Sequence, residues 1–521
     1  MIPLYSSDQV RAADKYAIEK LKIPSIVLME NAAINIKNAI LSEFHFLSEN
    51  STFGIICGKG NNGGDGFTLA RQLLISGFNV KIISLGKEED LKGDALTNFL
   101  ITQNFILDYP KSKFIVFQSS KNLSLLKKCD VIVDAILGTG VFGEPREQIK
   151  SIIKSINKLN SKKVAIDLPT GLNINNAAGN IIFEADLTVT LAELKNGLFY
   201  AKGKTNSGKV VKGSIGIGDS YFENRKVKEY LIEPEDALIG LPKKTKNLQK
   251  YSAGKVLVIA GSGSMPGAAI FTSNSASISG AGAGFLAYPK SVKSVPQKKL
   301  NSSIVLAYED NSKEYLSTNN LDELKDKIKW ADSIAIGPGL GREEETKQAV
   351  FDIMKSFPNK KMVVDADAIY ALRNSKYTKL DLRNKIFTPH HKEFADLVGV
   401  DVRMLGPNLF ILGRKFVLEM ETYLVLKGSP TLIFNPKGEI FINSAGNPGM
   451  AKFGTGDVLT GIITSFIAQN KEIENSIISA VYLHSLTADL QVKKGTEFEI
   501  TPEKIYKNFN KTITFLRNSI V

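Results

Sequence analysis

The first 220 residues alternate short apolar runs with longer amphipathic segments. The apolar runs are rich in β-branched residues and read FGIIC, NVKIISL, VIVDAIL, KVAIDLP and LTVTL. Short runs of this kind are typical of parallel strands that are buried on both faces of a sheet. The segments between them, such as GFTLARQLLISG and REQIKSIIKSINKL, have the spacing of helices that cover a sheet. This alternation predicts a doubly wound α/β domain.

A second series of the same kind follows a polar break. Residues 219–250 are rich in Lys and interrupted by Pro, which predicts a linker with one short strand and a helical turn. Apolar runs resume with GKVLVIAGS and continue through SIAIGPGLG, KMVVDADAIYAL and ETYLVLKGSPTLIF. Two longer segments, GTGDVLTGIITSFIAQN and NSIISAVYLHSLTADL, predict closing helices. We therefore expect two α/β domains, at residues 1–220 and 246–521, joined by a linker at residues 221–245.

Length, charge and cysteine content narrow the class of protein. A chain of 521 residues exceeds one ordinary domain. The net charge is +13, but the Lys residues are spread along the chain, so we expect a solvated basic surface and no nucleic-acid partner. No apolar run is long enough for a bilayer, and the first 20 residues lack the apolar core of a secretory signal, so we expect no membrane association. Cys57 and Cys129 have no metal-ligand spacing, which favours the reduced cytoplasm.

The stretch CGKGNNGGDG contains the spacing G-x-G-x-x-G, formed by Gly58, Gly60 and Gly63. It lies between a predicted strand and a predicted helix, where a glycine turn exposes backbone N–H groups to an anion. A hydride-transferring Rossmann domain also needs an acidic residue at the end of the next strand, to bind the ribose. Here NVKIISL is followed by Gly86 and Lys87, so the loop indicates a dinucleotide-like ligand but does not favour a dehydrogenase.

Polar side chains end two further predicted strands. Asp134 lies within VIVDAIL, near the end of the predicted strand. Asp167 closes KVAID and is followed by a turn that contains Thr170. Ligands of open α/β sheets bind beyond the carboxyl ends of the strands. Asn62, Asp134 and Thr170 offer the oxygen ligands that hard cations prefer. Each of these residues is also a common helix cap or turn former, and that alternative stays open.

Three stretches, CGKGNNGGDGFTLAR, VDAILGTGVFGE and AIDLPTGLN, together resemble the NAD(P)H-hydrate epimerase family, also called the YjeF N-terminal domain. The resemblance covers residues 1–220. It implies a Rossmann-like domain that interconverts the R and S forms of nicotinamide dinucleotides hydrated at C6. The glycines would then hold a damaged substrate and not a redox cofactor. It also implies substrate contacts at Asn61, Asn62, Gly63, Gly64, Asp65, Gly138, Thr139, Gly140, Val141, Phe142, Gly143 and Glu144.

The same resemblance implies a potassium ion bound by Asn62, Asp134 and Thr170. It places Asp167 near the reacting carbon, where a carboxylate is one group that can move the protons of an epimerisation. We therefore predict that Asp167 acts as an acid/base. Many family members have a Phe-Gly-x-Pro-Lys run where this chain reads TLAELKNGLFY, and Lys195 keeps the lysine of that run.

In the second domain, the stretch NPGMAKFGTGDVLTGII contains the residues that most clearly indicate a catalytic site. Gly454-Thr455-Gly456-Asp457 precedes a long apolar helix, and a glycine-rich turn at a helix start stabilises phosphoryl oxygens. An Asp inside that turn is placed to take a proton from an attacking hydroxyl. The alternative is that Asp457 only caps the helix.

The second domain resembles the ribokinase-like fold, and more narrowly the ADP/ATP-dependent NAD(P)H-hydrate dehydratases, over residues 245–521. The stretches that carry the resemblance are VLVIAGSGSMPGAAIFTS, SIAIGPGLGREEE, VVDADAIYAL, FTPHHKEFADLVG, VLKGSPTLI and NPGMAKFGTGDVLTG. Two positions depart from the family's usual run: His391-Lys392 replace Pro-Gly, and Phe453 replaces a glycine.

This resemblance implies that Ala268, Gly339 and His390 contact the hydrate and that Asp457 is the catalytic base. Nucleotide contacts fall on Lys427, Gly428, Ser429, Pro430, Thr431 and Gly456. A lone His after Pro is commonly a surface residue, so His390 has that alternative. Asp365 and Asp367, in the run DADA, are further candidates for a metal or a turn. The expected cofactors are K⁺ in the first domain and Mg²⁺ in the second, with ADP as co-substrate.

We therefore predict a bifunctional repair enzyme that epimerises NAD(P)H hydrates and dehydrates the S form with ADP, giving AMP and phosphate. We expect a homo-oligomer in the cytoplasm. One alternative is a ribokinase-like small-molecule kinase fused to a dinucleotide-binding domain. Another is a non-catalytic nucleotide or RNA scaffold in the first half.

Overall fold

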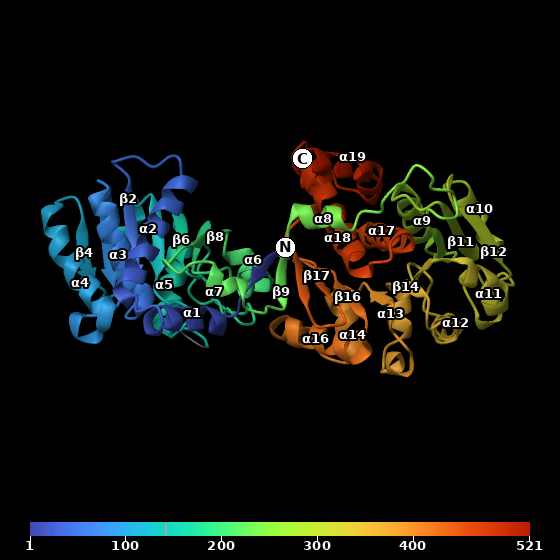
Figure 1. The fold of residues 1–521 in the computed structure, drawn as a ribbon, viewed down its shortest axis with the longest axis horizontal. Helices are drawn as coiled ribbons and strands as arrows, with labels where there is room; N and C mark the ends of the chain where they lie inside the picture. The colour runs from blue at the N-terminus through green and yellow to red at the C-terminus, as the bar shows by residue number, and fades with distance from the viewer. Residues whose placement is uncertain (141–142, 521) are drawn as a thin grey trace. The chain divides into compact units, whose positions relative to one another are not determined.

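The computed structural model describes residues 1–140 and 143–520. The chain divides into two compact units. The N-terminal unit is Pro3–Val227, and the C-terminal unit is Lys228–Val521 together with Met1–Ile2 (Figure 1). Each unit is an α/β domain built on its own sheet, which confirms the predicted fold class. Among the described residues, no helix is both long and apolar enough to cross a bilayer.

The N-terminal unit has a seven-stranded sheet in the order β4-β3-β2-β5-β6-β7-β8, and all its pairs are parallel. Its strands are β2 (Thr52–Cys57), β3 (Asn79–Ser84), β4 (Lys113–Val116), β5 (Val131–Ala135), β6 (Lys162–Ile166), β7 (Leu187–Leu191) and β8 (Lys209–Gly213). Its helices are α1 (Ser7–Glu19), α2 (Ser25–Glu43), α3 (Asn61–Ile75), α4 (Gly93–Phe105), α5 (Glu147–Asn157), α6 (Ala201–Asn206) and α7 (Ser220–Glu223). The order reverses between β2 and β5, which is the switch point where open α/β sheets bind ligands.

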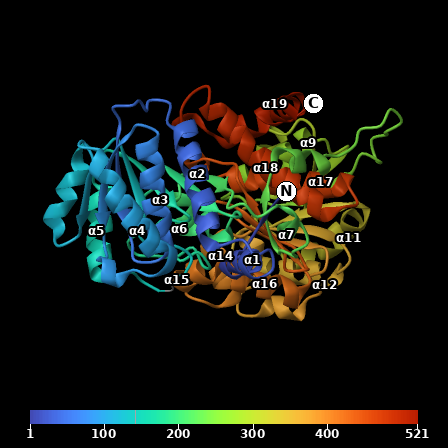
Figure 2. The same cartoon turned by 60° about the vertical axis from the view of Figure 1, so that its left-hand side comes forward.

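Helices cover both faces of this sheet. Ile55 of β2 packs with α2, α3 and α4, whereas its neighbour Ile56 packs with α5 on the other face. The three helices of the first group run side by side (Figure 2). Because successive strand residues point to opposite faces, a strand buried on both sides has to be apolar throughout. The apolar run FGIIC therefore becomes a central strand.

The C-terminal unit has an eleven-stranded sheet in the order β1-β9-β18-β17-β16-β15-β14-β13-β10-β11-β12. Its strands are β1 (Ile2–Leu4), β9 (Glu229–Ile232), β10 (Lys255–Ile259), β11 (Ala283–Pro289), β12 (Ile304–Tyr308), β13 (Ser333–Ile336), β14 (Lys361–Val364), β15 (Lys385–Phe387), β16 (Tyr423–Leu426), β17 (Leu432–Phe434) and β18 (Ile440–Asn443). The strands from β12 to β16 are parallel, and β17 is antiparallel to both its neighbours.

The helices of this unit are α8 (Pro234–Ile239), α9 (Pro266–Ile278), α10 (Ser294–Gln297), α11 (Leu321–Trp330), α12 (Glu344–Ser356), α13 (Asp367–Ala371), α14 (His391–Val398), α15 (Val402–Leu405), α16 (Leu409–Met420), α17 (Thr455–Gln469), α18 (Ile473–Val492) and α19 (Pro502–Ile520). The register aligns Val258, Ala335 and Val363 on one face of the sheet, and α9 and α17 pack on that face. The parallel strands β16, β15, β14 and β13 are adjacent, so their carboxyl ends lie along one edge.

The segment around the predicted linker contains regular structure. It forms α7, β9 and α8, and β9 pairs in parallel with β18 of the C-terminal sheet. The chain's first residue also belongs to that unit, because the Met1 ammonium lies 2.9 Å from Asp236 and 3.2 Å from Glu233.

Two candidate active sites

The loop between β2 and α3 and the first turn of α3 are packed so closely that Gly58 and Gly63 have no room for a side chain. A Cβ on Gly58 would stand 1.9 Å from the Ile136 carbonyl oxygen, and one on Gly63 would stand 2.0 Å from the Gly58 carbonyl oxygen. These approaches seat the start of α3 against the end of β5, at the switch point of the sheet. The first N–H groups of the helix, beginning at Asn61, therefore offer an anion site.

This loop lines a cavity of about 1020 Å³. The predicted substrate residues that line it are Asn61, Asn62, Asp65, Gly138, Thr139, Gly140, Glu144 and Asp167. Gly63 and Gly64 lie in the first turn of α3, and Gly143 lies beside Glu144 in the chain. Val141 and Phe142 fall outside the described residues. A cavity of this volume is large enough for a small-molecule ligand.

The three residues predicted to hold a cation gather at the ends of β2, β5 and β6. The Thr170 hydroxyl donates to one Asp134 oxygen and the Thr170 N–H donates to the other, both at 2.7 Å. Asp134 is fully buried and has no cationic partner among the described residues. Burial raises the pKa of its carboxyl to about 6, although the hydrogen bonds from Thr170 and Ile136 oppose that rise.

Asn62 completes the oxygen-donor set. A Cβ added to Gly138 would lie 3.3 Å from the Asn62 side-chain oxygen, so the loop after β5 passes over this amide. The Asn62 Nδ2 atom is buried and has no hydrogen-bond partner in the described chain. A carboxylate, a hydroxyl and an amide oxygen suit a hard monovalent cation, which would also offset the buried charge of Asp134. The residues present therefore fit the predicted potassium ion.

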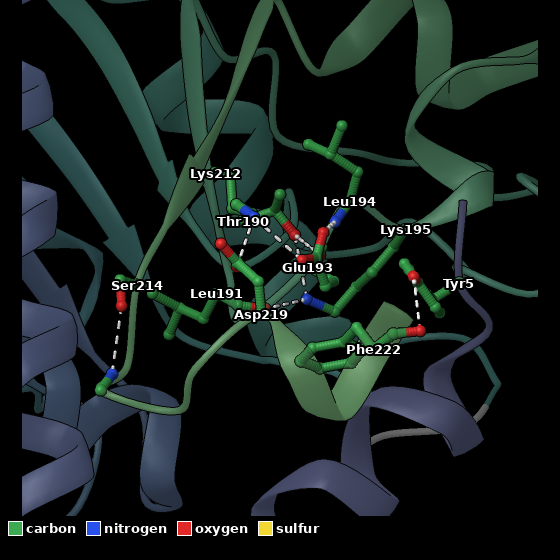
Figure 3. Close-up of polar contacts among 11 residues, drawn as sticks. Tyr5, Thr190, Leu191, Glu193, Leu194, Lys195, Lys212, Ser214, Asp219 and Phe222 are labelled. Carbon is green, nitrogen blue, oxygen red and sulfur yellow. Dashed lines mark hydrogen bonds and ion pairs between the residues drawn. The ribbon is translucent and has the colours of Figure 1, made fainter. Parts of the chain in front are cut away.

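Asp167 follows β6 directly, and its conformation is unusual. Its φ is 67°, a left-handed value that few side chains adopt. Lys195 donates to its Oδ1 at 2.7 Å. The same ammonium group also donates to the Thr190 hydroxyl and to the Leu191 carbonyl (Figure 3). Lys195 is fully buried, so its ammonium group is held between these oxygens. The lysine noted in the sequence thus contacts the carboxylate predicted to act on the substrate.

The helix start in the C-terminal unit is built around a left-handed glycine. Gly454 has a φ of 93°, and α17 begins at the next residue. Asp457 lies in the first turn of α17, and no side chain caps this helix. The structure therefore does not support the alternative that Asp457 serves only as an N-cap. Burial raises the pKa of the Asp457 carboxyl to about 7, and the negative charge of Asp365 adds to the rise.

A pair of charged residues near Asp457, Asp365 and Lys427, comes from the ends of β14 and β16, the two strands that flank β15. Asp365, after β14, accepts from Lys427 at 2.8 Å and from the Thr460 hydroxyl at 2.7 Å. Lys427 follows β16, and a Cβ on Gly456 would lie 3.2 Å from its ammonium nitrogen. The ammonium therefore lies against the turn that leads into Asp457, where it can attract phosphate oxygens.

The other predicted residues of this unit take three different positions. Gly339, with a φ of 64°, packs so closely on α9 that a Cβ there would lie 2.9 Å from Ala268. His390 caps α14 by accepting from the Glu393 N–H at 3.2 Å, and its side chain is about half exposed. The run from Gly428 to Thr431, which includes Ser429 and Pro430, follows Lys427 between β16 and β17. These residues all lie at the carboxyl edge of the parallel strands or on α9.

Comparison with known proteins gives two family matches. Residues 25–197 match the model of the YjeF-related protein N-terminus, and residues 256–511 match the model of NAD(P)H-hydrate dehydratase. A bifunctional NAD(P)H-hydrate repair enzyme from Moorella thermoacetica is 33% identical over 93% of this chain and 92% of its own length. The chain belongs to the family of bifunctional NAD(P)H-hydrate repair enzymes.

Two further proteins are similar to this repair-enzyme chain. The bifunctional NAD(P)H-hydrate repair enzyme of Dictyoglomus turgidum is 31% identical, and the alignment covers 97% of each chain. A solved structure, the ADP/ATP-dependent NAD(P)H-hydrate dehydratase from Bacillus subtilis, is 26% identical, with a TM-score of 0.47 over 55% of this chain and 98% of that one.

Three residues at the epimerase-like site of this repair-enzyme chain were not predicted as site residues. Lys195 was noted only as a lysine kept by the family, and Arg11 and Asp14 of α1 were not considered, yet both line the cavity. The N-terminal sequence contained a signal for Asp14. Val10, Ala13 and Ala17 form the buried stripe of α1, and Asp14 is a charged residue beside that stripe.

Proposed function

We propose that this chain repairs hydrated nicotinamide dinucleotides in two steps. The N-terminal unit interconverts the R and S hydrates, and the C-terminal unit dehydrates the S form with ADP, releasing AMP and phosphate. The observation that carries the proposal is that each unit has a helix start preceded by a glycine turn and a buried or partly buried carboxylate at the same site. This carboxylate is Asp167 in the N-terminal unit and Asp457 in the C-terminal unit. Both starts suit the phosphates of a dinucleotide or nucleotide.

In the proposed epimerase site, the loop from Asn61 to Asp65 and the segment from Gly138 to Glu144 bind the substrate's phosphates. Asp167 acts on the hydrated carbon as an acid/base. A potassium ion held by Asn62, Asp134 and Thr170 would supply positive charge next to the phosphate loop. The Lys195 ammonium holds Asp167 in place through the ion pair at 2.7 Å.

In the proposed dehydratase site, Asp457 takes the proton of the C6 hydroxyl as that oxygen attacks the terminal phosphorus of ADP. The bond between phosphorus and AMP breaks, and AMP leaves. Phosphate then leaves C6 with its electron pair while C5 loses a proton, which forms the C5–C6 double bond of the dihydronicotinamide. A pKa of about 7 suits a base that works near neutral pH. Lys427 and the N–H groups at Gly456 would bind the transferring phosphoryl group.

Magnesium would enter this site with the nucleotide. Three carboxylates, those of Asp365, Asp367 and Glu393, lie close enough to Asp457 to raise its pKa by charge repulsion, and Lys427 is the cation that opposes them. Arg342 pairs with Asp367 at 2.9 Å, and together with Lys427 it offsets part of this negative charge. A further cation would help the site to accept a diphosphate. Asp365 and Asp367 provide the oxygen donors that Mg²⁺ prefers, and they would share it with the phosphates.

A repair assay separates this proposal from a ribokinase-like kinase fused to a dinucleotide-binding domain. The full chain is incubated with a mixture of R and S NADH hydrates and ADP, and restored NADH is followed by its absorbance. Complete conversion supports both activities, and conversion of the S half alone supports only the dehydratase. No conversion with either ADP or ATP overturns the proposal and favours the kinase. The Asp167→Asn variant is the matched control, because we expect it to stop at the S half.

A further inference from the structure

A second carboxyl reaches the cavity of the N-terminal unit from a different part of the chain. Asp14 of α1 lines the same cavity as Asp167, although the two residues are far apart in the sequence. Burial raises the pKa of Asp14 to about 6, and the Asp167 charge adds to this rise while Lys195 opposes it. The two carboxyl groups therefore interact electrostatically.

The surroundings of Asp14 and Asp167 differ in one respect. Asp167 accepts from Lys195 and from the Leu191 N–H. Asp14 makes no hydrogen bond and no ion pair within the part of the chain that the structure describes. A partly buried carboxyl without a partner costs stability, and α1 gains no contact from it in return. This cost indicates a use other than folding.

An independent observation shows that this cavity is built for a polar ligand. The Asn62 amide is more than nine-tenths buried, lines the cavity, and leaves its Nδ2 atom without a partner in the described residues. The helix start at Asn61 lines the same cavity with its N–H groups. Asp14 thus lies in a cavity that already has the donors to hold a substrate.

We propose that Asp14 is the second proton-transfer residue of the epimerase site and works with Asp167 on the hydrated carbon. This inference rests on the epimerase activity proposed above. Carboxyls whose surroundings drive their protonation apart divide naturally into an acid and a base. Asp167, paired with an ammonium group, is suited to be the base, and Asp14, which has no ion pair among the described residues, is suited to be the acid.

The step balances without an oxidant or a reductant. Asp14 gives its proton to the C6 hydroxyl, the C6–O bond breaks, and its electron pair leaves with the water. The lone pair of N1 forms a double bond to C6. A water molecule then adds to the opposite face of C6, its proton passes to Asp167, and N1 recovers its lone pair. The reverse reaction uses the same two groups in exchanged roles, so the active pair carries one proton.

The charged groups that face Asp14 define the expected pH dependence. They are Asp167 and Lys195 beyond the ends of β6 and β7, Asp65 on α3, and Arg11 on its own helix. Burial, with Asp167 and Asp14, raises the pKa of Asp65 well above its usual range. At high pH, the pair formed by Asp14 and Asp167 should lose the one proton that it carries. We therefore expect kcat/KM to fall about tenfold for each pH unit on the alkaline side of its pH profile.

The test is the Asp14→Asn variant of the full chain, assayed with the R hydrate of NADH. We expect kcat for epimerisation to fall at least about 100-fold with KM changed little, and the alkaline limb to disappear. Dehydration of the S hydrate by the same preparation should be unchanged, because that site lies in the other unit. The matched control is Glu19→Gln, which makes the same change of charge on α1 at an exposed residue.

Two results would overturn the inference. One is an Asp14→Asn variant that epimerises at the wild-type rate while the wild type is active. The other is an equal loss in Asp14→Asn and in Asp14→Glu together with a lower melting temperature in both, which would make Asp14 structural. Partial recovery of kcat in Asp14→Glu supports the proposal. A wild type with no epimerase activity would instead overturn the proposed function of the unit.

Discussion

Both units have a glycine turn at a helix start, but the carboxylates that we propose as catalytic, Asp167 and Asp457, have different surroundings. In both, a glycine turn leads into a helix whose start offers backbone N–H groups to a ligand. In α17 these groups come after Thr455, whose own N–H donates to the Lys452 carbonyl. In the N-terminal unit, the buried Lys195 binds Asp167 directly at 2.7 Å. In the C-terminal unit, Lys427 is bound instead to the neighbouring Asp365, and Asp457 has no ion-pair partner among the described residues.

The comparison shows that the acid–base chemistry of a carboxylate depends on whether the nearby lysine binds that carboxylate or a neighbouring one. In the N-terminal unit, the Lys195 ammonium is bound directly to the Asp167 carboxylate and holds it in place. A lysine bound to the neighbouring carboxylate leaves burial and repulsion to raise the pKa of Asp457 to about 7. The epimerase-like site must move protons in both directions, whereas the dehydratase-like site needs a base that can take one proton near neutral pH.

The largest expected effect comes from removing the base. Asp457→Asn should lower dehydration of the S hydrate by about 10²- to 10⁴-fold, because the attacking hydroxyl loses its proton acceptor. Epimerisation by the same variant should be unchanged. Kinetics of both activities on one preparation check this, with Asp326→Asn on the exposed face of α11 as the control. A full rate of dehydration in Asp457→Asn would remove this residue from the mechanism.

Removing the lysine of the other site should cost stability as well as activity. Lys195→Met leaves the buried Asp167 carboxyl without its cation, which should destabilise the N-terminal unit by about 3–5 kcal/mol. Denaturant unfolding measures this cost. Lys209→Met, at an exposed ion pair of the same unit, should change stability by less than about 1 kcal/mol. Equal effects of the two substitutions would contradict a special role for the buried pair.

The raised pKa of Asp457 predicts the pH dependence of dehydration. The base must be ionised, so kcat/KM should rise about tenfold per pH unit up to a pH of about 7 and then level off. The same group affects stability with the opposite sign. Its contribution is complete below a pH of about 4 and is lost as the pH rises through 7. Asp457→Asn should therefore unfold at a higher temperature than the wild type at pH 8 but not at pH 4.

The two glycines that precede the helices should respond differently to alanine. Gly454 has a φ of 93°, and a Cβ there would lie 2.8 Å from Phe271 and from Pro502, so Gly454→Ala should cost about 1–3 kcal/mol. Gly60 has a φ of −102°, and a Cβ added there would meet nothing within 4 Å, so Gly60→Ala should cost no more than about 1 kcal/mol. Melting temperatures and nucleotide affinities of both variants check this contrast.

The sequence predicted the strands and their polar ends better than the links between distant segments. Runs such as FGIIC were sufficient to predict a sheet covered by helices on both faces, because a strand buried on both faces has to be apolar. Asp134 and Thr170 were predicted to lie together, since the ends of neighbouring parallel strands meet at one edge. Asp14 was missed because its place in the cavity depends on how α1 packs against the unit, and spacing within one helix does not specify that packing.

The last and smallest effect concerns a position where the sequence departs from its family. Phe453 precedes the left-handed Gly454, and its side chain is fully exposed, so it buries no surface. Because an exposed ring holds nothing in place, Phe453→Ala should change stability by less than about 0.5 kcal/mol.

The same substitution tests whether this ring has any part in binding ADP. A ring that only points to solvent predicts a KM for ADP within about threefold of the wild type in Phe453→Ala. Phe453→Gly separates the side chain from the backbone, because a second flexible residue beside Gly454 loosens the turn and should raise KM further than alanine does. A tenfold rise of KM already in Phe453→Ala would mean that the ring closes over the bound nucleotide, and the C-terminal site would then include a group that the N-terminal site lacks.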